Sequence, residues 1–377
     1  MSNKAHNEAA IQLWEQVFER LANSEFATII DDDTDNGIED QHFREALTNA
    51  GWNSSEIEAR INFHNEELAN APVTSPGVNP FVESHLDRIC TSVEEAMRRL
   101  HVDSASRAAR GVEPRTDHHA SMINVIMTDQ NIITVGSFFF RFCGLIARAF
   151  TRTLQLQPWL WEAPDYNDQL LRDLLRANPR ILSYWMTIYL SFAATGTHAL
   201  TSFRPASKRE VILFEQVARA MEIFSVAHEF GHHHHRHGGH IESDSKLEEF
   251  EADQFALKIC YEVERFPVIF QNPYLASGAG GVIVLMASDT LKKIKALVIG
   301  KRTQPQKTHP ETFERLKRFD SVACLTPSTF STLKGFRTAS ARIMGGVDNL
   351  MTELFDTIPH DVISDLQHLA KISREPE

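Results

Sequence analysis

The sequence predicts an α+β protein that is mainly helical, with a small antiparallel sheet at one edge. Apolar residues recur at helical spacing through residues 208–235, and a second helical segment covers about 246–264. Between residues 122 and 140, two runs rich in β-branched residues flank "TDQN", a pattern typical of a hairpin that precedes a helix. Long helices and one short hairpin together favour this class.

The remaining elements follow along the chain. Residues 1–70 contain short amphipathic helices, and "NAPVTSPGVNP" at 70–80 has the turn residues of a linker. A helix is expected from Phe81, and another over about 282–298. We therefore expect an N-terminal helical domain at 1–75, which controls access or recruits a partner. The main domain is expected at 80–345, with an insertion at 150–205, and a C-terminal helix at 346–377.

Composition and charge exclude some classes of function. The formal net charge of −12 argues against a nucleic-acid partner and against electrostatic docking on anionic lipid. Four cysteines stand far apart without a C-x-x-C pair, and the N-terminal residues lack a secretory signal, so we expect a cytoplasmic protein. Residues 181–200 are uncharged and long enough to cross a bilayer, but their Ser, Thr, Gly and His content favours a buried core helix. Peripheral contact with a membrane stays open.

The stretch "HEFGHHHHRHGGH" at 228–240 carries the main chemical signal. His228 and His232 are four residues apart on a predicted helix, so both imidazoles project from one face and can reach a single zinc ion. Glu229 is then placed to accept a proton from a zinc-bound water rather than to bind the metal. A histidine-rich tract that scavenges metal is the rival interpretation.

A third ligand is available in "EEFEAD", where Glu249 and Asp253 are four apart on the second helix. Glu249 lies 17 residues after His232 and completes a His₂Glu set, which leaves the fourth position open as catalytic zinc requires. Asp253 is expected to accept the free N–H of a zinc-bound imidazole, most simply that of His228. Glu248 is the alternative third ligand.

These residues resemble a known family. "HEFGH", "EFEAD" and "THPETFERLKRF" (308–319) look like the three ordered motifs of the gluzincin metallopeptidases that include the CaaX prenyl-protein protease and HtpX, and Gly231 and Ala252 match as well. The resemblance covers roughly residues 120–320 and implies a zincin-like core. It implies a zinc endopeptidase with ligands His228, His232 and Glu249 and with Glu229 as the catalytic base.

The resemblance implies three further roles. His309 corresponds to a family histidine that contacts substrate and stabilises the oxyanion. Arg315 matches the arginine that closes the same motif, and we expect it to take part in substrate binding. Asn124 lies in a segment similar to the family's edge strand, where an extended peptide substrate adds by main-chain hydrogen bonds. An ordinary hairpin is the equal alternative for that segment.

Some features depart from the family pattern. The gap of 17 residues before the third ligand is closer to short-spaced gluzincins such as thermolysin, and the membrane spans of the best-known members are missing. Two other functions therefore stay open: a regulatory protease with one substrate or an inactive metal sensor, and a non-enzymatic metal-binding protein. The other histidines of the stretch (His233, His234, His235, His237 and His240) are expected to be mostly solvated, although they could bind a second metal.

Overall fold

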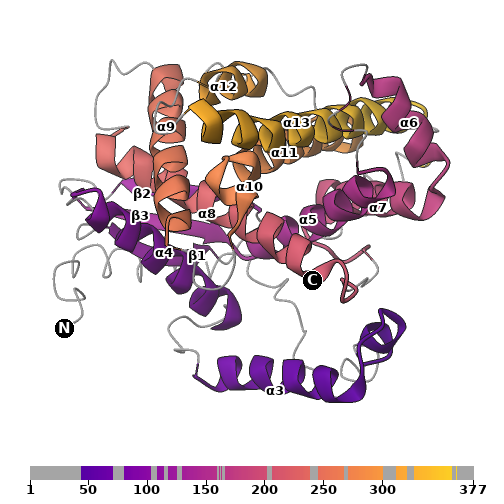
Figure 1. Ribbon diagram of the computed structural model, residues 1–377, viewed down its shortest axis with the longest axis horizontal. Helices are drawn as coiled ribbons and strands as arrows, with labels where there is room; N and C mark the ends of the chain where they lie inside the picture. The colour runs from indigo at the N-terminus through magenta and orange to yellow at the C-terminus, as the bar shows by residue number, and fades with distance from the viewer. Residues whose placement is uncertain are drawn as a thin grey trace.

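The computed structural model shows helices packed around one central helix, with a small sheet on one side (Figure 1). It describes residues 44–70, 80–102, 108–113, 118–124, 130–158, 161, 163, 166–201, 206–237, 245–266, 271–299, 311–320, 327–358 and 362. The helices within these ranges are α3 Ser54–Asn70, α4 Pro80–Arg99, α5 Phe139–Leu156, α6 Asp168–Arg176, α7 Pro179–Thr195, α8 Val211–His235, α9 Ser245–Glu264, α10 Pro273–Ala276, α11 Ala279–Ile299, α12 Thr312–Phe319 and α13 Pro327–Asp356. The predicted class, α+β and mainly helical, is confirmed.

Helix α8 is the centre of the core, and it packs against α4, α5, α9, α10 and α11. Its middle is apolar on nearly every side, and Met221, Ile223, Phe224, Val226 and Ala227 are all buried. A helix that is apolar all round is stable only when neighbours cover every face. The position of its last turns is therefore held by the whole core.

Helix α8 ends in a Schellman turn. Arg236 adopts the left-handed conformation with φ of 59°, the N–H of His237 donates to the carbonyl of His232 at 3.0 Å, and the N–H of Arg236 donates to His233 at 3.3 Å. Gly238 and Gly239, which follow this turn in the sequence, lie outside the described residues. Because the chain reverses at Arg236, His237 comes back beside the last turn of α8.

Two glycines allow the long helices to approach closely. A Cβ atom built on Gly231 would lie 2.8 Å from the Cα of Ala252, so α8 and α9 meet at a point where only glycine fits. A Cβ on Gly280 would lie 2.3 Å from the backbone of Ala220, which brings α11 equally close to α8. These contacts fix the spacing between α8 and the two helices beside it.

The sheet contains strands β1 Ala108–Glu113, β2 Ala120–Asn124 and β3 Asn131–Gly136, in the order β1-β3-β2. The hairpin is confirmed, because β2 pairs antiparallel with β3. The small sheet is mixed rather than antiparallel throughout, because a third strand, β1, pairs parallel with β3. The segment "AARGVE" has few β-branched residues, and tertiary pairing rather than local propensity makes it a strand.

The segment predicted as a buried core helix is α7. Tyr184, Trp185, Ile188, Tyr189 and Phe192 are at most 1% exposed, and the helix packs against α5 and α11. Within the described ranges, every helix is too short or too polar to cross a membrane.

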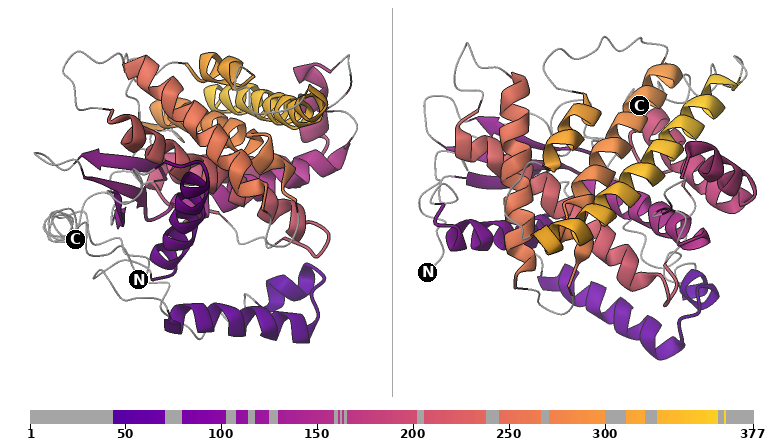
Figure 2. Two further views of the ribbon diagram at one scale, coloured as in Figure 1. Left: turned by 60° about the vertical axis from the view of Figure 1, so that its left-hand side comes forward. Right: turned by 45° about the horizontal axis from the view of Figure 1, so that its top comes forward.

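The N-terminal helices have a small core of their own, made by Leu47, Ile57 and Ile61 with Trp52 packed against them. Figure 1 and Figure 2 show α3 at the lower edge of the structure in each view. Ion pairs of Glu56 with Lys208 and of Arg60 with Glu215 connect it to the start of α8. A hydrogen bond from the indole of Trp52 to the carbonyl of Ala206, 3.0 Å long, links it to the segment before α8. At the other end of the chain, α13 runs without a break across residue 345, where the C-terminal helix was expected to begin.

Candidate metal centre

His228, His232 and Glu249 meet between α8 and α9. The Nε2 atoms of the two histidines are 3.1 Å apart. Nε2 of His228 lies 3.4 Å from Oε2 of Glu249, and Nε2 of His232 lies 3.6 Å from Oε1 of the same carboxylate. Ligands on a tetrahedral zinc ion at about 2.05 Å are separated by about 3.3 Å. The three donor atoms are thus already at the spacing that zinc needs. The alternative ligand, Glu248, is not part of this group.

A buried arginine balances the carboxylates of this site. From α12, Arg315 donates to both oxygens of Asp253, at 2.7 Å and 2.6 Å, and its third nitrogen lies 3.2 Å from Glu249. Burial alone would raise the pKa of Asp253, but the charge and hydrogen bonds of Arg315 outweigh it and lower the pKa. Asp253 is therefore an anion, and it holds α9 and α12 together at the site.

Asp253 also faces the first histidine. Its Oδ1 lies 3.1 Å from Nδ1 of His228, within hydrogen-bonding distance but without the alignment of a straight hydrogen bond. Burial alone would lower the pKa of His228, but its contacts with Asp253 and Glu249 outweigh burial and raise the pKa to about 10. While His228 carries its proton, it and Arg315 balance the two carboxylates. Once His228 gives up that proton, as binding a metal requires, the carboxylates exceed the single charge of Arg315 and favour a bound cation.

The second histidine has a different partner. Nδ1 of His232 lies 2.8 Å from Nδ1 of His237, whose Nε2 lies 3.0 Å from Oε2 of Glu251. Burial, together with the charge of nearby His228, lowers the pKa of His232 to about 3, so this ring is neutral and suited to bind a metal. The sequence did not indicate this contact chain, since it depends on the turn at Arg236.

Two of the additional histidines are buried, so the expectation that they are mostly solvated is wrong for them. His233 is 1% exposed and its Nδ1 lies 2.7 Å from the amide nitrogen of Asn131 in β3, which anchors the last turn of α8 to the sheet. His237 is 6% exposed. His235 is exposed, and His234 is half-buried against Phe255.

The structure places the other predicted residues as follows. Glu229 is half-buried on α8 beside the first ligand. Asn124 is exposed at the end of β2, and its amide nitrogen donates to the carbonyl of His237 at 3.4 Å, so the strand end reaches the metal centre. Arg315 is buried against the two acidic residues rather than exposed. His309 lies outside the described residues.

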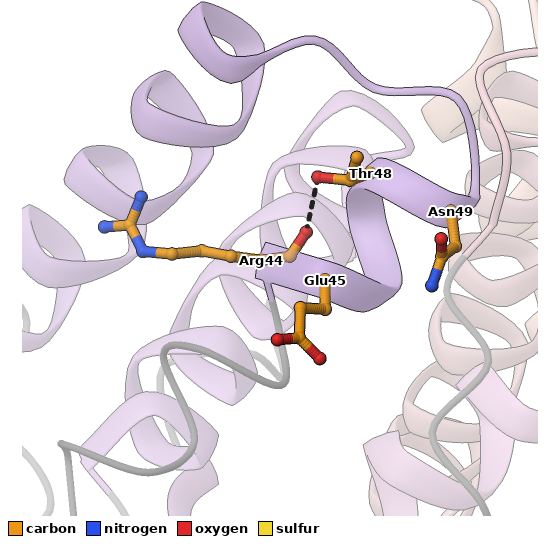
Figure 3. A pocket seen from close by; sticks show the side chains of 4 residues that line it. All are labelled: Arg44, Glu45, Thr48 and Asn49. Atoms are coloured by element: carbon orange, nitrogen blue, oxygen red, sulfur yellow. Dashed lines mark hydrogen bonds between the residues drawn. The ribbon is translucent and has the colours of Figure 1, made fainter.

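A pocket elsewhere in the structure is unrelated to this site. Arg44, Glu45, Thr48 and Asn49 line it, on the helical segment before α3 (Figure 3). The hydroxyl of Thr48 donates to the carbonyl of Arg44 at 2.8 Å, while the side chains of Arg44 and Asn49 point in different directions. Since these side chains do not converge, we assign no chemistry to this pocket.

Comparison with known proteins agrees with a peptidase. No curated protein and no solved structure gives a significant match to the chain. Membership in the CaaX protease and HtpX family stays a prediction. One family model matches, Peptidase U49, over residues 199–327, about a third of the chain, and this range includes α8, α9 and α12. The match supports a protease, and it covers His228, His232 and Glu249, the three residues that could hold a metal ion.

Proposed function

We propose that this protein is a zinc-dependent endopeptidase that hydrolyses internal peptide bonds. The observation that carries the proposal is the convergence of His228, His232 and Glu249 on one point, beside a glutamate on the same helix. Two imidazoles and one carboxylate are a donor set typical of catalytic zinc, with one position left for water. Zinc held there supplies a Lewis acid and brings the pKa of water down to about 7.

The residues of the chain divide the remaining work. Glu229 takes the proton from the attacking water and passes it to the leaving amine. Asp253 orients His228, and Arg315 keeps Asp253 charged and in place. This positioning role suits a buried arginine better than direct substrate contact, while His309 remains the proposed donor to the oxyanion.

We propose that the substrate lies along β2. This strand ends the described sheet, β2 packs against α8, and Asn124 at its end contacts the backbone of His237. An extended peptide that pairs with a terminal strand presents its bonds in a fixed register. The substrate is therefore a protein or peptide in extended form. The free thiols of Cys90, Cys143 and Cys260 suit the reducing cytoplasm that we propose as its location.

The test combines zinc content with cleavage. Purified protein should hold one tightly bound zinc, and Glu229→Gln should retain it while losing cleavage of a peptide library by a factor of about 100 or more. Cleavage by this variant at the wild-type rate would overturn the mechanism. Glu249→Gln should lose zinc, whereas the neighbouring Glu248→Gln should keep it, and the reverse result would exchange the third ligand.

The same measurements separate the alternatives. A protein that only stores metal has no need of Glu229, so it would bind zinc and cleave nothing in either form. A regulatory protease with one substrate would leave the library intact and cleave one protein of a whole-cell extract, again only with Glu229 present. The N-terminal helices are the part that we propose recruits such a partner.

A further inference from the structure

A second set of metal-binding side chains lies at the end of α8. His235, His237 and Glu251 each offer one ligand atom, and these atoms lie within 4.8 Å of one another. None of the three belongs to the first centre. Two imidazole nitrogens and a carboxylate oxygen again form a donor set that Zn²⁺ accepts.

The three side chains differ in how far they are already in place. His237 is buried, and its Nε2 lies 3.0 Å from Oε2 of Glu251, which is a ligand-to-ligand spacing. His235 is exposed at the last position of α8, and the side chain of Glu251 is 42% exposed. Because His237 and Glu251 are already at ligand spacing, only the side chain of His235 has to rotate toward them, and its exposure makes that rotation cost little.

We propose that His235, His237 and Glu251 form a second, weaker Zn²⁺ site, and that filling this site weakens the first centre through His237. The binding part of this proposal is independent of catalysis. Its consequence for activity rests on the proposed peptidase function.

The link between the sites is the hydrogen-bond chain from His232 to Glu251. When His232 binds a metal through Nε2, its hydrogen is on Nδ1, 2.8 Å from Nδ1 of His237. His237 can accept this hydrogen bond only while its own hydrogen is on Nε2, where it faces Glu251. In this arrangement each donor meets an acceptor.

A cation on Nε2 of His237 disrupts that arrangement. The ring hydrogen then occupies Nδ1 of the same ring, and two N–H groups face each other across the short contact with His232. The contact must open, and His232 loses the partner that orients it. Loss of such a partner typically lowers metal affinity or activity by about 10–100-fold.

The experiment titrates the full-length metal-free protein with Zn²⁺ by calorimetry. Wild type should bind two equivalents, the second about 100-fold or more weakly than the first, because two of its three ligands are exposed. His235→Gln should bind one equivalent, because it removes a ligand of the second site and leaves the contacts among His232, His237 and Glu251 intact. The matched control is His234→Gln, which removes the adjacent histidine outside the set and should bind two.

Coupling is measured by release of radioactive zinc from the first centre during a chase with unlabelled zinc. In wild type, release should be about tenfold faster at a zinc concentration that fills the second site than at a low one, and cleavage should fall about tenfold over the same range. His235→Gln should show neither change.

Each result decides one part of the proposal. A single equivalent in wild type, or two in His235→Gln, would overturn the second site. Two equivalents with release independent of zinc concentration would overturn the coupling. Absence of cleavage in all proteins would refute the proposed peptidase function, while the binding and release data would still test the second site.

Discussion

Replacing Gly231 by alanine is a direct test of how the metal centre is built. The added Cβ would lie 2.8 Å from Cα and 3.0 Å from the carbonyl oxygen of Ala252, and 3.2 Å from Cβ of Phe255. Carbon atoms in good contact are about 3.5–4.0 Å apart. Because two of the three atoms belong to the backbone of α9, they cannot rotate away, and α9 must move from α8 by about 0.7 Å or more.

Two effects on stability oppose each other. Overpacking costs about 1–3 kcal/mol, and the backbone clash puts this site near the upper end of that range. Alanine is better than glycine inside a helix by about 1 kcal/mol. The expected net loss is therefore about 2 kcal/mol in the free energy of unfolding.

The effect on metal binding should be larger than stability alone predicts. Glu249 is three residues before Ala252 on the same helix, so it moves away from both histidines together with α9. Metal sites tolerate ligand displacements of only about 0.2 Å. We expect zinc affinity to fall by about tenfold or more.

The assay is chemical unfolding of the metal-free protein, followed by zinc competition with a chromophoric chelator. The matched control is Gly144→Ala in α5, where nothing lies within 4 Å of the added Cβ. This variant should gain up to about 1 kcal/mol and keep its zinc affinity. If Gly231→Ala matches the control in both measurements, the close approach of α8 and α9 does not set the ligand spacing.

Three further predictions follow. Arg315→Gln should lower the free energy of unfolding by about 3–5 kcal/mol in urea titration, because Asp253 and Glu249 stay buried without their cation; a loss below 1 kcal/mol would contradict the pairing. His228 has a pKa of about 10 without metal and must be neutral to bind zinc, so zinc binding should release about one proton between pH 7 and 10. Zinc affinity should then rise about tenfold per pH unit over this range. Calorimetry in two buffers of different ionisation enthalpy counts the released protons, and no release would refute the assignment. Asn124→Ala should raise KM several-fold in peptide cleavage assays with little change in kcat or zinc content, whereas an unchanged KM would separate β2 from substrate binding.

The central residues of the site could be predicted because their geometry is local. His228 and His232 lie on one helix, and Glu249 and Asp253 on another, so helical periodicity alone predicts that the members of each pair share a face. Gly231 lies between the two histidines, and its lack of a side chain lets α9 approach α8 closely enough to bring Glu249 to them.

The parts that could not be predicted depend on long-range packing or on unusual backbone conformations. His237 reaches His232 only because Arg236 is left-handed, a conformation that an arginine rarely adopts and that its sequence neighbours do not indicate. Strand β1 exists through its pairing with β3. Arg315 was assigned to substrate binding by resemblance, and its position against Asp253 depends on how α12 docks.

The contact between Arg315 and Asp253 determines when the site can assemble while the chain is being synthesised. The two residues are 62 positions apart, so at about 5–20 residues per second the ribosome adds Arg315 about 3–12 s after Asp253. During that interval the carboxylates of α9 have no guanidinium to pair with, and burying them against α8 is costly. The candidate metal centre should therefore assemble only after α12 has been synthesised, so that a growing chain would not present the complete set of side chains to nearby nascent proteins.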